Sequence, residues 1–88
     1  MAKNYKVSIT VVSQKGHCAY EHKVGNQWIT EGKTPEGICL SAFNSLNPFL
    51  RVLMYGGILP WEDDPDKTTI ACPDAANPVV FELRRLRE

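Results

Sequence analysis

Apolar and polar residues alternate near both ends of this chain. In the stretch 5–11 every second side chain is apolar, namely Tyr5, Val7, Ile9 and Val11. The stretch 79–87 repeats the pattern with Val79, Phe81 and Leu83. Because successive side chains of a strand point to opposite faces, this spacing predicts two strands, each with one buried face. A chain of 88 residues is expected to form a single domain, residues 1–88.

The middle of the chain predicts a helix. Thr34 can cap its start, and Pro35 suits the first helical position. Apolar residues then recur at helical spacing: Ile38, Cys39, Ala42, Phe43 and Leu46. Pro48 predicts either a kink or a second start capped by Asn47, because proline cannot donate the helical hydrogen bond. The pair Gly56-Gly57 predicts the end of the helix.

Two further strands complete the predicted fold. The stretch 23–32 predicts a weaker strand centred on Trp28 and Ile29, and 67–72 predicts a short strand with Ile70 and Cys72 on one face. The order is therefore strand, strand, kinked helix, strand, strand. Such an order predicts an α+β fold, in which the helical segment covers one face of an antiparallel sheet.

The charge balance narrows the range of partners. Lys and Arg number 10 and Asp and Glu also number 10, so the net charge is zero. The chain therefore lacks the broad positive field of nucleic-acid-binding proteins, and we expect no nucleic-acid partner. The longest uncharged stretch, 37–50, is too short and too polar to cross a membrane. With no apolar leader at its start, the chain is expected to be cytoplasmic, where its 3 cysteines stay reduced.

Four residues form a candidate ligand set. Cys18 and His22 are close in sequence, Cys39 lies near the predicted helix start, and Cys72 ends a predicted strand. Backbone N–H groups at such a strand end can point at sulfur and stabilise its charge. Three cysteines and one histidine are a known ligand set for structural zinc, with iron or an iron–sulfur cluster as the next choices.

Two other interpretations of these residues stay open at this point. Cys39 and Cys72 fall on apolar faces, and reduced cysteine often packs as a small hydrophobic residue. The two close Cys-x-x-Cys pairs typical of zinc sites are absent from the sequence. Alternatively, Cys39 with His22 as base would form a thiolate–imidazole pair, the minimum for a thiol-dependent redox protein or enzyme.

The runs "GHCAYEHKVG", "TPEGIC", "GGILPWEDDPD" and "ACPDAANPVVFELRR" occur in that order. Together they resemble a family of small, uncharacterised bacterial and archaeal proteins of about 90 residues, a typical length for one small domain. The resemblance implies that Cys18, His22, Cys39 and Cys72 are motif positions, but it brings no activity. Similar proteins often carry glycine and an acidic residue where this chain has Glu21 and Asn26.

The remaining motifs give weaker indications of a functional site. The acidic run 62–66 lacks the spacing of a calcium loop and predicts a solvated turn. Arg84 and Arg85 are expected on opposite faces of the last strand, where such residues often protect a sheet edge. The stretch 56–61 either exposes an apolar strip for a protein partner or homo-oligomer, or folds back over the core. With no catalytic motif present, we expect a non-enzymatic, metal-binding accessory or interaction domain.

Overall fold

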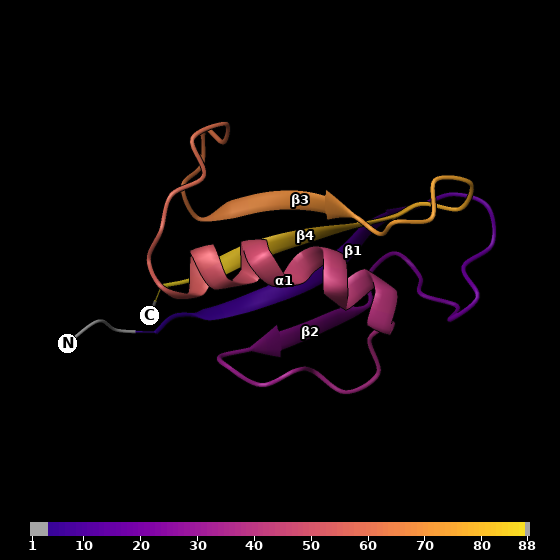
Figure 1. The fold of residues 1–88 in the computed structure, drawn as a ribbon, viewed down its shortest axis with the longest axis horizontal. Helices are drawn as coiled ribbons and strands as arrows, with labels where there is room; N and C mark the ends of the chain where they lie inside the picture. Colours follow the sequence, from indigo (N-terminus) through magenta and orange to yellow (C-terminus); the bar gives the residue numbers. More distant parts are fainter. Residues whose placement is uncertain (1–3, 88) are drawn as a thin grey trace.

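The computed structural model describes residues 4–87 and contains a single layer of strands with one helix packed on it (Figure 1). Its elements are β1 (Lys6–Gln14), β2 (Gln27–Thr30), α1 (Leu40–Met54), β3 (Lys67–Ala71) and β4 (Val79–Leu86). The strands form one antiparallel sheet in the order β2-β1-β4-β3. The predicted α+β fold, with its helix against one face of an antiparallel sheet, is confirmed.

The two strands predicted from alternation are the central pair of the sheet. β1 and β4 lie antiparallel, with Ile9 opposite Leu83 and Val11 opposite Phe81. These four side chains are at most 1% exposed. A bulge between Val11 and Ser13 ends the strict alternation of β1. The helix α1 covers this apolar face of the sheet. Its buried residues complete the core: Ala42, Leu46, Leu50, Leu53 and Met54.

The helix begins later than its sequence signals predict. Its first residue is Leu40, and Cys39 occupies the capping position with an extended backbone. The predicted start at Thr34 and Pro35 was wrong because Gly37 adopts φ +90°, a left-handed conformation that a helix cannot contain. Past Leu40 the helix continues through Pro48 to Met54, so no second helix starts at Asn47.

The helix ends as predicted, at the glycine pair. Gly56 has φ +81°, and its N–H donates to the Leu53 carbonyl. The N–H of Gly57 donates to the Val52 carbonyl at 2.7 Å, which completes a Schellman motif. This sharp reversal directs the chain into the loop 55–66.

Arg85 anchors this end of the helix to the sheet. It lies on the inward face of β4 and is 3% exposed. Its guanidinium donates to the carbonyls of Leu53 and Gly57 and to the Asp66 carboxylate. The suggestion that the arginines protect a sheet edge was wrong, because β4 is a central strand. Arg85 instead satisfies carbonyl groups that a helix end leaves without partners.

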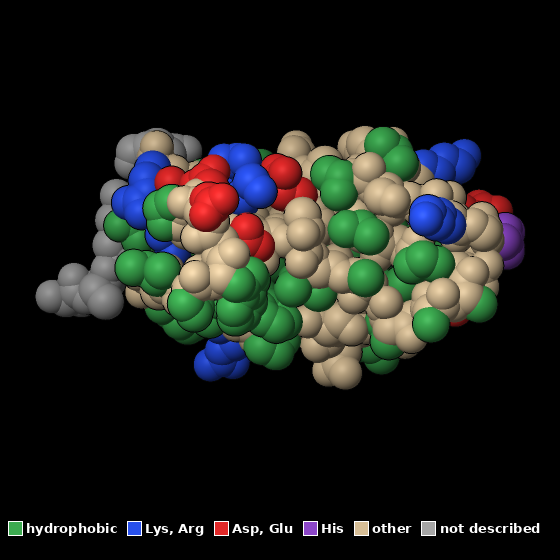
Figure 2. Space-filling view, turned by 90° about the horizontal axis from the view of Figure 1, so that it is seen from above, with side chains coloured by type: hydrophobic (Ala, Val, Ile, Leu, Met, Phe, Trp, Pro, Cys, Tyr) green, Lys and Arg blue, Asp and Glu red, His purple; other side chains and the backbone are tan. Residues whose placement is uncertain are grey.

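Charged side chains gather at the end of the molecule that carries the loop 55–66 (Figure 2). Arg84 pairs with Asp64, and Arg87 pairs with Asp66. In the same loop Leu59 is buried, whereas Ile58 is 71% exposed. The stretch 56–61 therefore covers part of the core and also leaves an apolar surface. Within residues 4–87, the helix is too short and too polar to span a bilayer.

Candidate thiol site

Cys18 lies in the long connection between β1 and β2. A turn closes around it, because the N–H of Glu21 donates to the Cys18 carbonyl at 2.8 Å. Just before it, the N–H of His17 donates to the side-chain oxygen of Asn77 at 2.8 Å. Asn77 belongs to the loop between β3 and β4. This bond therefore ties the loop of Cys18 to the loop that follows Cys72.

Gly16 makes that junction possible. It has φ +68°, and a Cβ atom placed there would lie 2.2 Å from the side-chain oxygen of Asn77. Gly16→Ala is expected to lower the free energy of unfolding by about 2 kcal/mol, from backbone strain and from the displaced Asn77. Gly25→Ala is the matched control, because Gly25 has φ +98° and no atom within 4 Å of the added Cβ.

Urea denaturation of the two variants checks this prediction. Both should lose stability from the left-handed backbone, and Gly16→Ala should lose more because it also disrupts the contact with Asn77. Equal losses in the two variants would show that the junction contributes nothing to stability.

Cys39 lies at the N-terminus of α1. Its carbonyl accepts the first helical hydrogen bond, from the N–H of Phe43 at 2.8 Å. The helix dipole favours negative charge at this position, which includes a thiolate. The N–H of Cys39 donates to Nε2 of His22 at 3.1 Å. His22 thus fixes the backbone from which the Cys39 side chain projects.

Cys72 follows β3 directly and lies opposite the start of β4. Its N–H donates to the Val79 carbonyl at 2.9 Å, and the N–H of Val79 donates to the Cys72 sulfur at 3.3 Å. The predicted backbone N–H group directed at this sulfur is confirmed. Such a bond stabilises negative charge on sulfur.

The three thiols line one pocket, although they are far apart in sequence. Cys18, Cys39 and Cys72 are free and half-buried, and they border a pocket of about 380 Å³. Asp74, which also lines it, uses its carboxylate to accept the N–H groups of Ala76 and Asn77 within its own loop. The thiols are therefore the groups in the pocket best suited to bind a soft ligand.

His22 lies beside this pocket and does not line it. His22 is 5% exposed, and its ring contacts the rings of Tyr20, Trp28 and Phe81 at centroid distances of 6.2, 5.3 and 6.1 Å. Burial lowers the pKa of His22, because the charged imidazolium loses hydration. The ring is therefore neutral at pH 7. With Nε2 accepting a hydrogen bond, the proton is on Nδ1.

The four predicted ligands are neighbours without forming a preformed metal centre. Among residues 4–87, no group of three or more His, Cys, Asp or Glu side chains is arranged to hold an ion. The Nε2 atom of His22 is directed at the backbone of Cys39, so no imidazole–thiolate pair uses this nitrogen. Sequence patterns gave no indication of the other pocket walls, such as Tyr20 and Pro73.

No family model, curated protein or solved structure matches this chain. The family resemblance of the four sequence runs therefore stays a prediction. In the turn that follows Cys18, Glu21 has φ +58°, in the left-handed region. It is the one non-glycine residue with positive φ in the described range 4–87. A glycine would adopt this conformation without strain.

Proposed function

We propose that this protein binds one thiophilic metal ion through Cys18, Cys39, Cys72 and His22, with zinc as the first choice. The observation that carries the proposal is the shared pocket: three thiols from three separate segments border the same space. Thiolate sulfur and neutral imidazole are the donors that zinc prefers, and a set of three cysteines and one histidine is typical of structural sites.

The positions of two of the thiols also support metal binding. Cys39 lies at the positive end of α1, and the N–H of Val79 is directed at the Cys72 sulfur. Helix N-termini and backbone N–H groups directed at sulfur are common surroundings of metal-bound cysteines. His22 is neutral, so it does not have to lose a proton before it can bind.

Binding would require a local rearrangement. Within residues 4–87 the donors are not gathered around one point, and His22 would have to release the N–H of Cys39 to coordinate through Nε2. The connection that carries Cys18 and His22 is the segment best suited to move, because it has little regular structure. The core strands and α1 would keep their positions.

The metal would supply stability rather than catalysis. It would join three segments that are far apart in the sequence, namely the β1–β2 connection, the start of α1 and the end of β3. The domain would then serve as an accessory or interaction module. The exposed Ile58 and Trp61 offer a surface for a protein partner or a second copy.

A thiol-dependent redox protein or enzyme is less well supported. That function needs an imidazole nitrogen near the Cys39 sulfur, and Nε2 of His22 instead accepts the backbone N–H. Alkylation of Cys39 followed against pH distinguishes the two functions. An apparent pKa as high as that of free cysteine would argue against an activated thiol.

Metal analysis of protein purified without added metal tests the proposal. We expect about one zinc ion per chain and a melting temperature that falls when the ion is removed by a chelator. If the bound metal is iron, the proposed identity of the ion is wrong and the proposed ligands stand. Substoichiometric metal, with a melting temperature unchanged by the chelator, would contradict a structural ion.

A further inference from the structure

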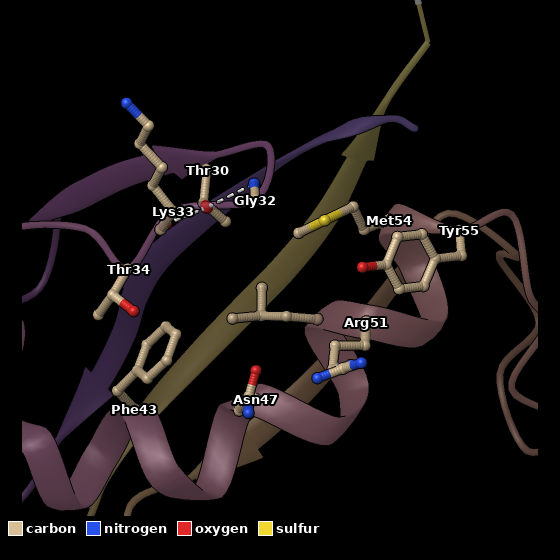
Figure 3. A pocket seen from close by; sticks show the side chains of 10 residues that line it. Thr30, Gly32, Lys33, Thr34, Phe43, Asn47, Arg51, Met54 and Tyr55 are labelled. Atoms are coloured by element: carbon tan, nitrogen blue, oxygen red, sulfur yellow. Dashed lines mark hydrogen bonds between the residues drawn. The ribbon is translucent and has the colours of Figure 1, made fainter. Parts of the chain in front are cut away.

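A second pocket lies between the loop that follows β2 and the second half of α1 (Figure 3). Its volume is about 160 Å³. None of its lining residues is a cysteine, so it is separate from the thiol pocket. Figure 3 shows loop residues on one side, helix residues on the other and a space between them.

The loop side is held by Thr30. This side chain is buried, and its hydroxyl accepts the N–H of Gly32 and donates to the Lys33 carbonyl. Gly32 has φ +138°, a conformation that favours glycine. These contacts fix the turn that places Thr34 opposite the helix. The wall is thus built by the chain itself and needs no ligand to form.

The helix side combines an apolar base with a polar ridge. Phe43 provides partly exposed apolar surface, whereas Leu50 and Met54, which also line the pocket, are buried. Asn47, Arg51 and Tyr55 follow one another at intervals of four residues, so they lie along one line of the helix surface. In Figure 3 the Tyr55 hydroxyl and the Asn47 amide point toward the space, and the Arg51 guanidinium lies between them.

The pocket carries positive charge. Lys33 and Arg51 line it, whereas no Asp or Glu does. In Figure 3 the Lys33 amine extends away from the space, which leaves Arg51 as the cation at its edge. Within residues 4–87, the side chains of Asn47, Arg51 and Tyr55 have no hydrogen-bond or ion-pair partner. These groups are therefore available to a ligand.

We propose that this pocket binds a small organic carboxylate with a short apolar chain. The planar guanidinium of Arg51 matches a carboxylate in geometry and charge, and Asn47 and Tyr55 add donors beside it. The apolar chain packs on Phe43, the apolar side chain of the pocket that is partly exposed. At roughly 30 Å³ per water, the volume holds about five waters, which suits a molecule the size of butyrate.

This inference is independent of metal binding at the cysteines. It uses different residues and a different end of α1. Loss of zinc binding in a cysteine variant would leave it unaffected, and failure to bind a carboxylate would leave the thiol site unaffected.

Titration of the ¹⁵N-labelled full chain with sodium butyrate, followed by amide chemical shifts, tests the proposal. We expect saturable shifts confined to residues 30–34 and 43–56. Arg51→Gln should raise the dissociation constant at least about tenfold, since it removes a charged hydrogen bond. Lys15→Gln is the control, because Lys15 is an exposed cation in the β1–β2 connection and should leave binding unchanged.

Butanol and inorganic phosphate test the apolar contacts and the charge interaction separately. Butanol keeps the apolar chain without the charge, and phosphate keeps the charge without the chain. Both should bind more weakly than butyrate. Butyrate shifts that do not saturate, an affinity for butanol or phosphate equal to that for butyrate, or unchanged binding by Arg51→Gln would each overturn the proposal.

Discussion

Replacement of Arg85 by methionine is expected to lower the free energy of unfolding by about 3 kcal/mol. Arg85 is buried, and its guanidinium donates to the carbonyls of Leu53 and Gly57 and to Asp66. Methionine would keep much of the side-chain volume and would remove every one of these donors. The two carbonyls would then be left at the buried helix end without partners, which is the main cost.

Thermal unfolding measures this loss. A loss of that size should lower the melting temperature by about 12–24 °C in a domain of this length. Arg84→Met is the matched control, because Arg84 is 42% exposed and pairs with Asp64 and Glu82 at the surface. The control should change stability by less than about 1 kcal/mol. Similar melting temperatures for the two variants would contradict the structural role of Arg85.

Replacement of Cys72 by serine is expected to weaken zinc binding by at least about a hundredfold. Serine preserves an acceptor for the N–H of Val79, so the turn between β3 and β4 should persist. Its hydroxyl is a poor ligand for zinc, because it stays protonated at neutral pH. Without metal, the variant should therefore fold like the unmodified protein. Only its affinity for zinc should fall.

Competition with a coloured chelator gives the two affinities. Ser41→Ala is the control, because Ser41 lines the same pocket and belongs to no proposed ligand set. It should retain the affinity of the unmodified protein. Equal zinc affinity in the cysteine variant and in the unmodified protein would remove Cys72 from the site.

The fold followed from patterns that reach across whole elements. Alternation in β1 and β4 predicted that Phe81 and Leu83 lie on the buried face, and the structure adds Arg85 to that face. A buried position for Arg85 is unexpected from its charge, because a charged side chain is seldom buried without partners. Its partners, the carbonyls of Leu53 and Gly57, come from the helix end. The sequence alone could not identify them, because only the packing of the helix on the sheet brings them to Arg85.

Local signals were less reliable than long patterns. Thr34 and Pro35 have the chemistry of a helix start, and two residues later Gly37 adopts a left-handed conformation that prevents it. The sequence identified the candidate metal-binding side chains of the thiol site. It could not show that His22 would contact the backbone of Cys39 while Cys18 and Cys72 border the pocket, because that depends on tertiary packing.

X-ray absorption at the zinc edge, recorded on the zinc-loaded protein, tests the proposed metal site most directly. A site built from Cys18, Cys39, Cys72 and His22 predicts sulfur neighbours at about 2.3 Å and nitrogen at about 2.0–2.1 Å, in a ratio of three to one. A spectrum with only oxygen and nitrogen neighbours would contradict it, because zinc would then be bound elsewhere on the protein.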